Sequence, residues 1–205
     1  MKSIRMAAAA LTAGIALTAC STPVEAGAAA VVGKERIAAQ DLNARVQELQ
    51  TAMQTAKINP AEIGIPLNQA VLYRMVDSSR SLQVAAASGV QVTEAEIDQF
   101  VAAAEQQAQG MSVNEQLMRS AVPPSIGRTY LRSIISVQKL IQKFGGGTDQ
   151  AAQERATEPL GKEFQKFKVT YNPRYGAFDA QQQGFVDTGR FGKLTATTQP
   201  QTPQG

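Results

Sequence analysis

The strongest constraint on the fold is a series of apolar stripes with helical spacing, separated by glycine and proline. Each stripe recurs every three or four residues, as one face of an α-helix does, and such a face has to be buried against other elements. The stripes predict helices over residues 40–56, 66–88, 93–110, 112–121 and 126–144. A weaker pattern over 149–168 contains Pro159, and because proline removes a main-chain hydrogen bond we expect a kinked helix or two pieces there.

Two of these helices begin with a recognisable N-terminal signal. Thr93 is followed by Glu96, and Ser112 by Glu115, each three residues further on. In this arrangement the hydroxyl accepts a main-chain N–H of the first turn while the carboxylate accepts the N–H of the capping residue. Both starts are therefore predicted as capping boxes.

Strand signals stand at the two ends of the helical region. Residues 29–32 and 35–37 are β-branched or alternating and flank Gly33-Lys34, which predicts a short hairpin. Residues 168–171 alternate in the same way, and a strand needs a partner for its main-chain groups. We therefore expect a mainly α fold of five to six helices with a small sheet formed by the N-terminal hairpin and a C-terminal strand.

The first nineteen residues have the pattern of a signal peptide. Lys2 and Arg5 precede an apolar stretch over residues 6–17, which is too short to be a membrane-spanning helix. It ends in a sequence that resembles the bacterial lipobox, formed by Leu17, Thr18, Ala19 and Cys20. Cys20 is the one cysteine of the chain, and the motif predicts that it carries a lipid and becomes the new N-terminus. The alternative is an ordinary signal peptide with a chance cysteine at its end.

The remaining chain divides by composition. Residues 20–28 have little bulky apolar content and are predicted to be a tether. Residues 29–178 carry the helix and strand patterns and are predicted to form one domain. Residues 179–205 are rich in Gln, Gly, Thr and Pro, and we expect them to be a disordered tail. The protein is thus expected outside the cytoplasm, anchored by lipid to the outer face of the cell membrane, or to the outer membrane if the source is Gram-negative.

Composition removes several classes of chemistry. The chain has no histidine and a single cysteine, so a Ser-His-Asp site, a histidine-ligated zinc site and an intramolecular disulfide are excluded. A net charge of +3, two units of which come from Lys2 and Arg5, does not indicate binding to nucleic acid. We expect no enzyme activity and no cofactor.

Three segments together resemble a known family. Residues 32–37 (VGKERI) lead into Asp41-Leu42 at a helix start, and residues 92–97 (VTEAEI) open a later helix. Their order is similar to that in the N-terminal chaperone domain of the SurA, PrsA and trigger-factor type foldases, with Val32 where that family usually has Asn. Residues 172–176 (NPRYG) resemble the end of short SurA-like lipoproteins of high-GC Gram-positive bacteria.

The resemblance implies a chaperone domain without its usual enzyme. Foldases of this type also carry a parvulin prolyl-isomerase domain of on the order of a hundred residues. Residues 145–167 leave no room for one, and the histidines of a parvulin site are missing. The expected function is binding of unfolded or exported polypeptides by a lipid-anchored protein. The alternatives are an envelope scaffold that docks one folded partner and, ranked last, a foldase associated with prolyl isomerisation.

Candidate binding residues come from two groups. Met53, Met75 and Met118 stand at helical spacing, where methionine lines an adaptable apolar surface or fills gaps in a core. The second group is Asn172, Pro173, Arg174, Tyr175 and Gly176. It is either a recognition loop or a turn that ends the last strand and packs back on the N-terminal hairpin, and turn chemistry favours the latter. No metal site is expected.

Overall fold

The computed structural model describes residues 26–107, 110–179, 181 and 184–186. The helices within these ranges are α1 (Ala39–Thr55), α2 (Leu67–Ala87), α3 (Glu94–Gln107), α4 (Val113–Arg119), α5 (Gly127–Gly145) and α6 (Gln150–Gln165). The strands are β1 (Ala28–Val32), β2 (Glu35–Ala38), β3 (Val169–Tyr171), β4 (Ala177–Asp179) and β5 (Gly184–Val186). Short 3-10 turns lie at Pro60–Ile63 (η1), Pro124–Ile126 (η2) and Pro173–Tyr175 (η3). The prediction of a mainly helical fold is confirmed.

The two ends of the helical region meet in one sheet, as the sequence predicted. The strand order is β2-β1-β3, and both pairs are antiparallel. Val32 lies opposite Glu35 across the hairpin turn, and Ala30 lies opposite Tyr171. Beyond the strand, the side-chain amide of Asn172 donates to the carbonyl of Ala28 at 2.8 Å. The sheet therefore joins the start and the end of the domain.

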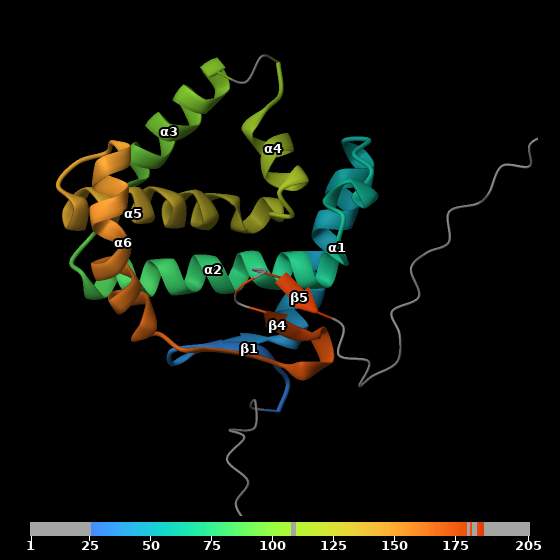
Figure 1. Ribbon diagram of the computed structural model, residues 1–205. Helices are drawn as coiled ribbons and strands as arrows, with labels where there is room; N and C mark the ends of the chain where they lie inside the picture. The colour runs from blue at the N-terminus through green and yellow to red at the C-terminus, as the bar shows by residue number, and fades with distance from the viewer. Residues whose placement is uncertain (1–25, 108–109, 180, 182–183, 187–205) are drawn as a thin grey trace, which may run out of the picture.

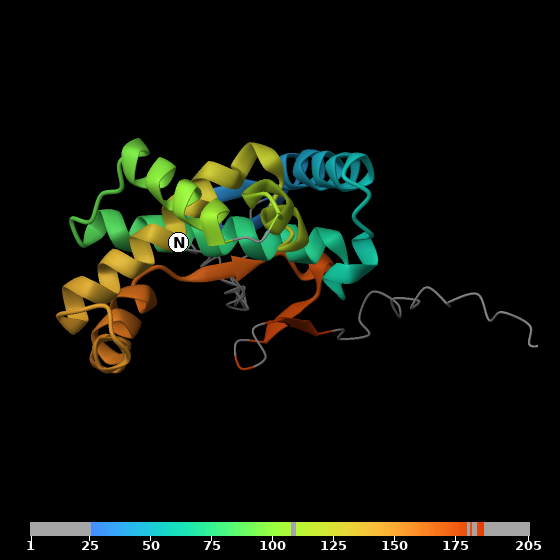
Figure 2. The ribbon, with the colours of Figure 1, turned by 90° about the horizontal axis from the view of Figure 1, so that it is seen from above.

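Helix α2 is the central element (Figure 1). It lies between α5 on one side and the sheet on the other, with α1 near its N-terminal end and α6 near its C-terminal end. Figure 2, seen from above, shows α1 and α6 near these opposite ends of α2. Its buried residues contribute to two of the three apolar clusters: one shared with α1, the sheet and α4, and one shared with α5 and α6. The third cluster joins α3, α4 and α5. Helices α2 and α5 thus connect all parts of the core.

Both predicted capping boxes are present. The Thr93 N–H donates to the Glu96 carboxylate at 2.8 Å, and the Glu96 N–H donates to the Thr93 hydroxyl at 3.3 Å. The corresponding distances between Ser112 and Glu115 are 3.0 Å and 3.2 Å. Each box satisfies two main-chain donors that a helix start otherwise leaves open.

Of the two expectations for the sixth helix, the division into two pieces is wrong, and the kink stays a prediction. Helix α6 runs continuously through Pro159. Ala152 and Ala156 are buried before the proline, and Leu160 and Phe164 pack on the apolar cluster after it. Because residues on both sides of the proline are packed against the rest of the domain, tertiary packing outweighs the hydrogen bond that the proline removes.

The predicted disorder from residue 179 onward is wrong for Gly184–Val186. This segment forms β5, which pairs with β4 so that Phe178 lies opposite Phe185. Both phenyl rings contact Tyr171, at centroid distances of 4.8 Å and 5.0 Å, and Phe178 also stacks on Tyr73 of α2 at 5.8 Å. These aromatic contacts offset the weak strand preference of the Gln- and Gly-rich sequence. Residues 187–205 of the predicted tail lie outside the described residues.

Candidate functional site

Two of the three candidate methionines are in the core. Met53 is fully buried and Met118 is 7% exposed, and both belong to the cluster around α1 and the sheet. Their assignment to a binding surface is therefore wrong, and the core interpretation is confirmed. Met75 differs, because it is only partly buried and lines a surface groove.

Residues 172–176 form a structural turn. The Asn172 carboxamide oxygen accepts the Arg174 N–H at 3.1 Å and begins the 3-10 turn η3. Tyr175 is buried in the core, and its carbonyl accepts a hydrogen bond from the Gln69 side chain at 2.8 Å. Gly176 has a φ of 101°, which glycine adopts without strain. Arg174 is exposed and lies over the Tyr175 ring. The turn interpretation of Pro173 and its neighbours is thus supported, with Tyr175 as the anchor.

The groove that contains Met75 runs along one face of α2 and has a volume of about 410 Å³. Its floor is a stripe of α2 residues three or four positions apart: Met75, Ser78, Ser79, Leu82, Gln83 and Ala86. Glu35 and Ile37 of β2 form one wall, and Ile126 at the end of η2 and Thr129 in the first turn of α5 form the other. Apolar side chains from three elements therefore line one recess.

Hydrogen bonds hold the β2 wall of the groove against α2. The Ser79 hydroxyl donates to Glu35 Oε2 at 2.6 Å, and Gln83 Nε2 donates to the same oxygen at 3.2 Å. Gln83 Nε2 also donates to the carbonyl of Val32 at 3.0 Å. These bonds fix the hairpin relative to the helix, so the groove is preformed.

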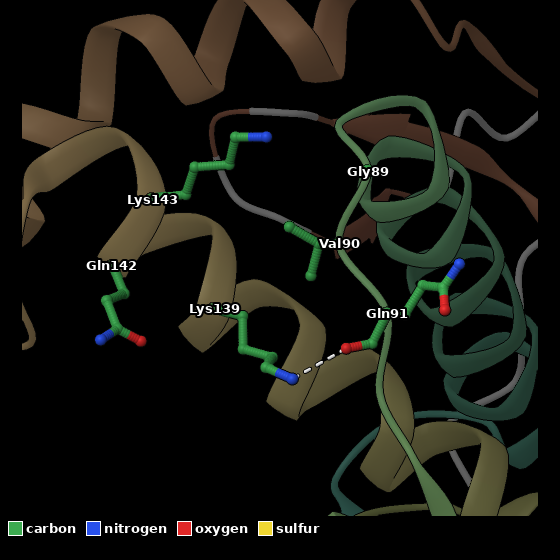
Figure 3. Close-up of a pocket in the computed structure, with 6 residues that line it drawn as sticks. All are labelled: Gly89, Val90, Gln91, Lys139, Gln142 and Lys143. Carbon is green, nitrogen blue, oxygen red and sulfur yellow. Dashed lines mark hydrogen bonds between the residues drawn. The ribbon is translucent and has the colours of Figure 1, made fainter.

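A second hollow lies at the C-terminal end of α2 (Figure 3) and has a volume of about 380 Å³. Lys139 reaches from α5 to the carbonyl of Gln91 at 2.8 Å and pairs with Glu96 at 2.5 Å. Lys143 donates to the carbonyl of Ser88 at 2.5 Å. Both ammonium groups are thus paired to main-chain or carboxylate oxygens near the end of α2. A cation at the C-terminal end of a helix is stabilising. The lysines that line this hollow therefore have a structural role, and we do not assign a binding function to it.

A half-buried carboxylate lies beside the aromatic cluster. Burial raises the pKa of Asp77, and Arg74 and Arg80 oppose that rise by favouring the ionised form. Burial and the Asp77 charge also raise the pKa of Tyr73, and burial raises the pKa of Tyr171. Tyr73 and Tyr171 stack on Phe178 of β4, and neither they nor Asp77 line the groove.

Other kinds of site find little support in the part of the chain that the structure covers. Among its residues no group of three or more His, Cys, Asp and Glu is placed to hold a metal ion. Within the described ranges, no helix has both the length and the apolarity to cross a membrane. Cys20 and the lipobox positions Leu17, Thr18 and Ala19 lie outside the described residues.

Comparison with known proteins gives one match. The family model described as the SurA-like N-terminal domain matches residues 4–123, which is more than half of the 205-residue chain. The matched segment contains β1, β2 and α1–α4, and it includes most of the groove lining. No curated protein and no solved structure matches the chain. The match confirms the resemblance carried by residues 32–37 and 92–97, whereas residues 172–176 lie outside the matched segment. The chain belongs to the family of SurA-like N-terminal domains.

Proposed function

We propose that this protein is a chaperone-like lipoprotein that holds apolar segments of unfolded, exported polypeptides in the groove along α2. The family is chaperone-like, which supports a polypeptide ligand. The observation that carries the proposal is the apolar lining formed by Ile37, Met75, Leu82, Ala86 and Ile126.

The size and chemistry of the groove suit a short apolar segment. A volume of about 410 Å³ accepts a few apolar side chains but not a folded domain. The Ser79 and Gln83 donors are already bonded to Glu35 and Val32, so the groove offers a ligand mainly its apolar side chains. Burying apolar ligand surface contributes roughly 25 cal/mol per Å², which favours a weak and reversible complex for a ligand of this size.

The rest of the described surface offers few other apolar contacts. Among the described residues, the large hydrophobic residues that are exposed are Ile65 (49%) and Met111 (41%). Neither lines the groove. A holding function therefore depends on the recess and not on an extended apolar patch.

The membrane location is part of the proposal and rests on the lipobox. A lipid on Cys20 would place the domain at the membrane surface, since each buried CH2 of an acyl chain contributes about 0.8 kcal/mol. The function that we propose is holding of the client without catalysis.

The test compares two alanines that are neighbours in α2. Ala86 lines the groove and Ala87 is exposed next to it without lining the groove. Ala86→Gln fills part of the groove with a polar side chain, whereas Ala87→Gln makes the same change outside it. We expect the mature wild-type chain and Ala87→Gln to slow aggregation of a chemically unfolded client, followed by light scattering, and Ala86→Gln to do so several-fold less well.

Two results would refute the proposal. One is equal protection by both variants, with circular dichroism showing that both are folded. The other is no protection by the wild-type chain at stoichiometric amounts. In the second case, recovery of one folded partner by cross-linking would favour the scaffold function instead.

A further inference from the structure

The groove has a single fixed charge at its rim. Among the described residues that line the groove, Glu35 is the one that carries a charge. Its neighbours in sequence, Lys34 and Arg36, are not among the lining residues, and the Arg36 guanidinium donates to the carbonyl of Ala26. The electrostatic character of the rim is therefore set by one carboxylate.

Side chains of α2 hold one oxygen of the Glu35 carboxylate and leave its other oxygen available. Both donors from α2, the Ser79 hydroxyl and the Gln83 amide, approach Oε2, at 2.6 Å and 3.2 Å. Across the described parts of the chain, no hydrogen bond or ion pair to Oε1 is found, and Glu35 takes part in none of the ion pairs. Most other surface carboxylates near α3 and α5 have cationic partners: Glu94 and Asp98 pair with Arg128, and Glu96 pairs with Lys139.

From this arrangement we propose that the groove selects apolar segments that carry a lysine or arginine, and that Glu35 is the residue that recognises the basic side chain. This inference rests on the proposed function and specifies its ligand. The apolar side chains of the segment lie on Ile37, Met75 and Leu82. The ammonium or guanidinium group of a neighbouring residue then reaches Oε1 at the rim.

The chemistry of the rim favours this ligand over an acidic one. A charge-assisted hydrogen bond to a carboxylate whose other oxygen is already held costs little reordering of the protein. A ligand carboxylate at the same place would meet a like charge without a compensating cation. Because the rim is exposed, the discrimination is modest, about two- to five-fold in Kd, and it weakens as salt screens the pair.

The experiment uses three fluorescent peptides with identical apolar residues and a lysine, a glutamine or a glutamate at one position. Binding is measured by anisotropy to the mature chain in nanodiscs of zwitterionic lipid, with empty nanodiscs as the blank. We expect the lysine peptide to bind about two- to five-fold more tightly than the glutamine peptide and the glutamate peptide to bind least well. The preference should shrink at 1 M salt, where the Debye length is about 3 Å.

Substitutions of Glu35 test whether its carboxylate causes the preference for the lysine peptide. Glu35→Gln should remove the difference between the three peptides, and Glu35→Lys should reverse the order. Glu105→Gln is the matched control, because Glu105 is exposed on α3 and the substitution changes the net charge equally. This control should keep the wild-type preference.

The outcomes separate this inference from the proposed function. If the glutamine peptide binds but charge makes no difference, or if Glu35→Gln keeps the lysine preference, the selectivity inference is wrong and the holding function stands. If none of the peptides binds, the proposed function itself fails. A lysine preference that Glu105→Gln also removes would point to net charge and would overturn the role of Glu35.

Discussion

Gly145 is the position where a single added carbon should disturb the fold most. It is the last residue of α5, and the chain turns directly into α6. A Cβ built on Gly145 lies 2.0 Å from the carbonyl oxygen of Ala152 and 2.7 Å from its carbonyl carbon. These are main-chain atoms in the first turn of α6, so no side-chain rotation relieves the contact. Gly145→Ala therefore forces α5 and α6 apart.

The magnitude follows from two opposing effects. Overpacking a core costs about 1–3 kcal/mol, and a clash with main chain belongs at the upper end. Replacing glycine by alanine in a helix contributes up to about 1 kcal/mol in the other direction. The net expectation is a loss of about 2 kcal/mol in the free energy of unfolding.

Gly161 supplies the matched control, because it is a helical glycine in the same pair of helices. It lies inside α6, and a Cβ there meets no atom within 4 Å. Gly161→Ala should therefore stabilise the protein by about 0.5–1 kcal/mol through the helix preference alone. The two substitutions are chemically identical, so the opposite signs isolate the steric effect.

Urea unfolding followed by circular dichroism at 222 nm measures both variants against the wild type. With a slope of about 1–3 kcal/mol per M, a difference of about 3 kcal/mol between the two variants separates their midpoints by about 1–3 M. A Gly145→Ala protein within about 0.5 kcal/mol of the wild type would refute the argument, since it would mean that α6 moves without cost.

Three further predictions concern a buried hydroxyl, a partly exposed carboxylate and the lipid anchor. The Tyr175 hydroxyl is buried without a hydrogen-bond partner among the described residues, so Tyr175→Phe should raise the free energy of unfolding by about 1 kcal/mol; a loss of stability would show that the hydroxyl is satisfied in solution. Lys139 and Thr93 lower the pKa of Glu96 from 4.5 to about 2, so the stabilisation that they give is present above pH 4.5 and is lost as the pH falls towards 2. Glu96→Gln should therefore flatten the pH dependence of urea unfolding in that window, and an unchanged slope would contradict the assignment. Cys20→Ser should move the protein from the membrane fraction to the aqueous fraction after detergent phase separation, and a variant that stays with the membrane would rule out anchoring through Cys20.

The positions of the helices could be predicted because local signals define them. The stripe through Leu42, Leu49 and Met53 is buried as the spacing indicated, and the capping boxes fix two helix starts. The pairing of β1 with β3 also followed from local patterns, since each strand needed a partner and few candidates existed.

The groove could not be predicted, because periodicity identifies an apolar face but not what covers it. Met75, Leu82 and Ala86 belong to the apolar stripe of the second helix, yet the structure leaves them accessible between β2 and α5. The contact between Glu35 and Ser79 joins residues 44 positions apart, and no local pattern indicates it. Strand β5 was missed for a similar reason, since the aromatic contacts that stabilise it come from Tyr171 and Phe178.

The sheet that joins the two ends of the domain also makes folding depend on a complete chain. A protein is synthesised from its N-terminus, so the hairpin of β1 and β2 can pack on α2 but has no third strand beside it until residues 169–171 have been made. The hydrogen bond between Asn172 and Ala28 spans 144 positions, and closing so long a loop costs only slightly more than closing a short one. A chain that stops within α6 leaves one edge of β1 open, and open strand edges promote aggregation. Pairing with β3 thus distinguishes a full-length domain from a truncated one, because a truncated product cannot cover this edge of β1.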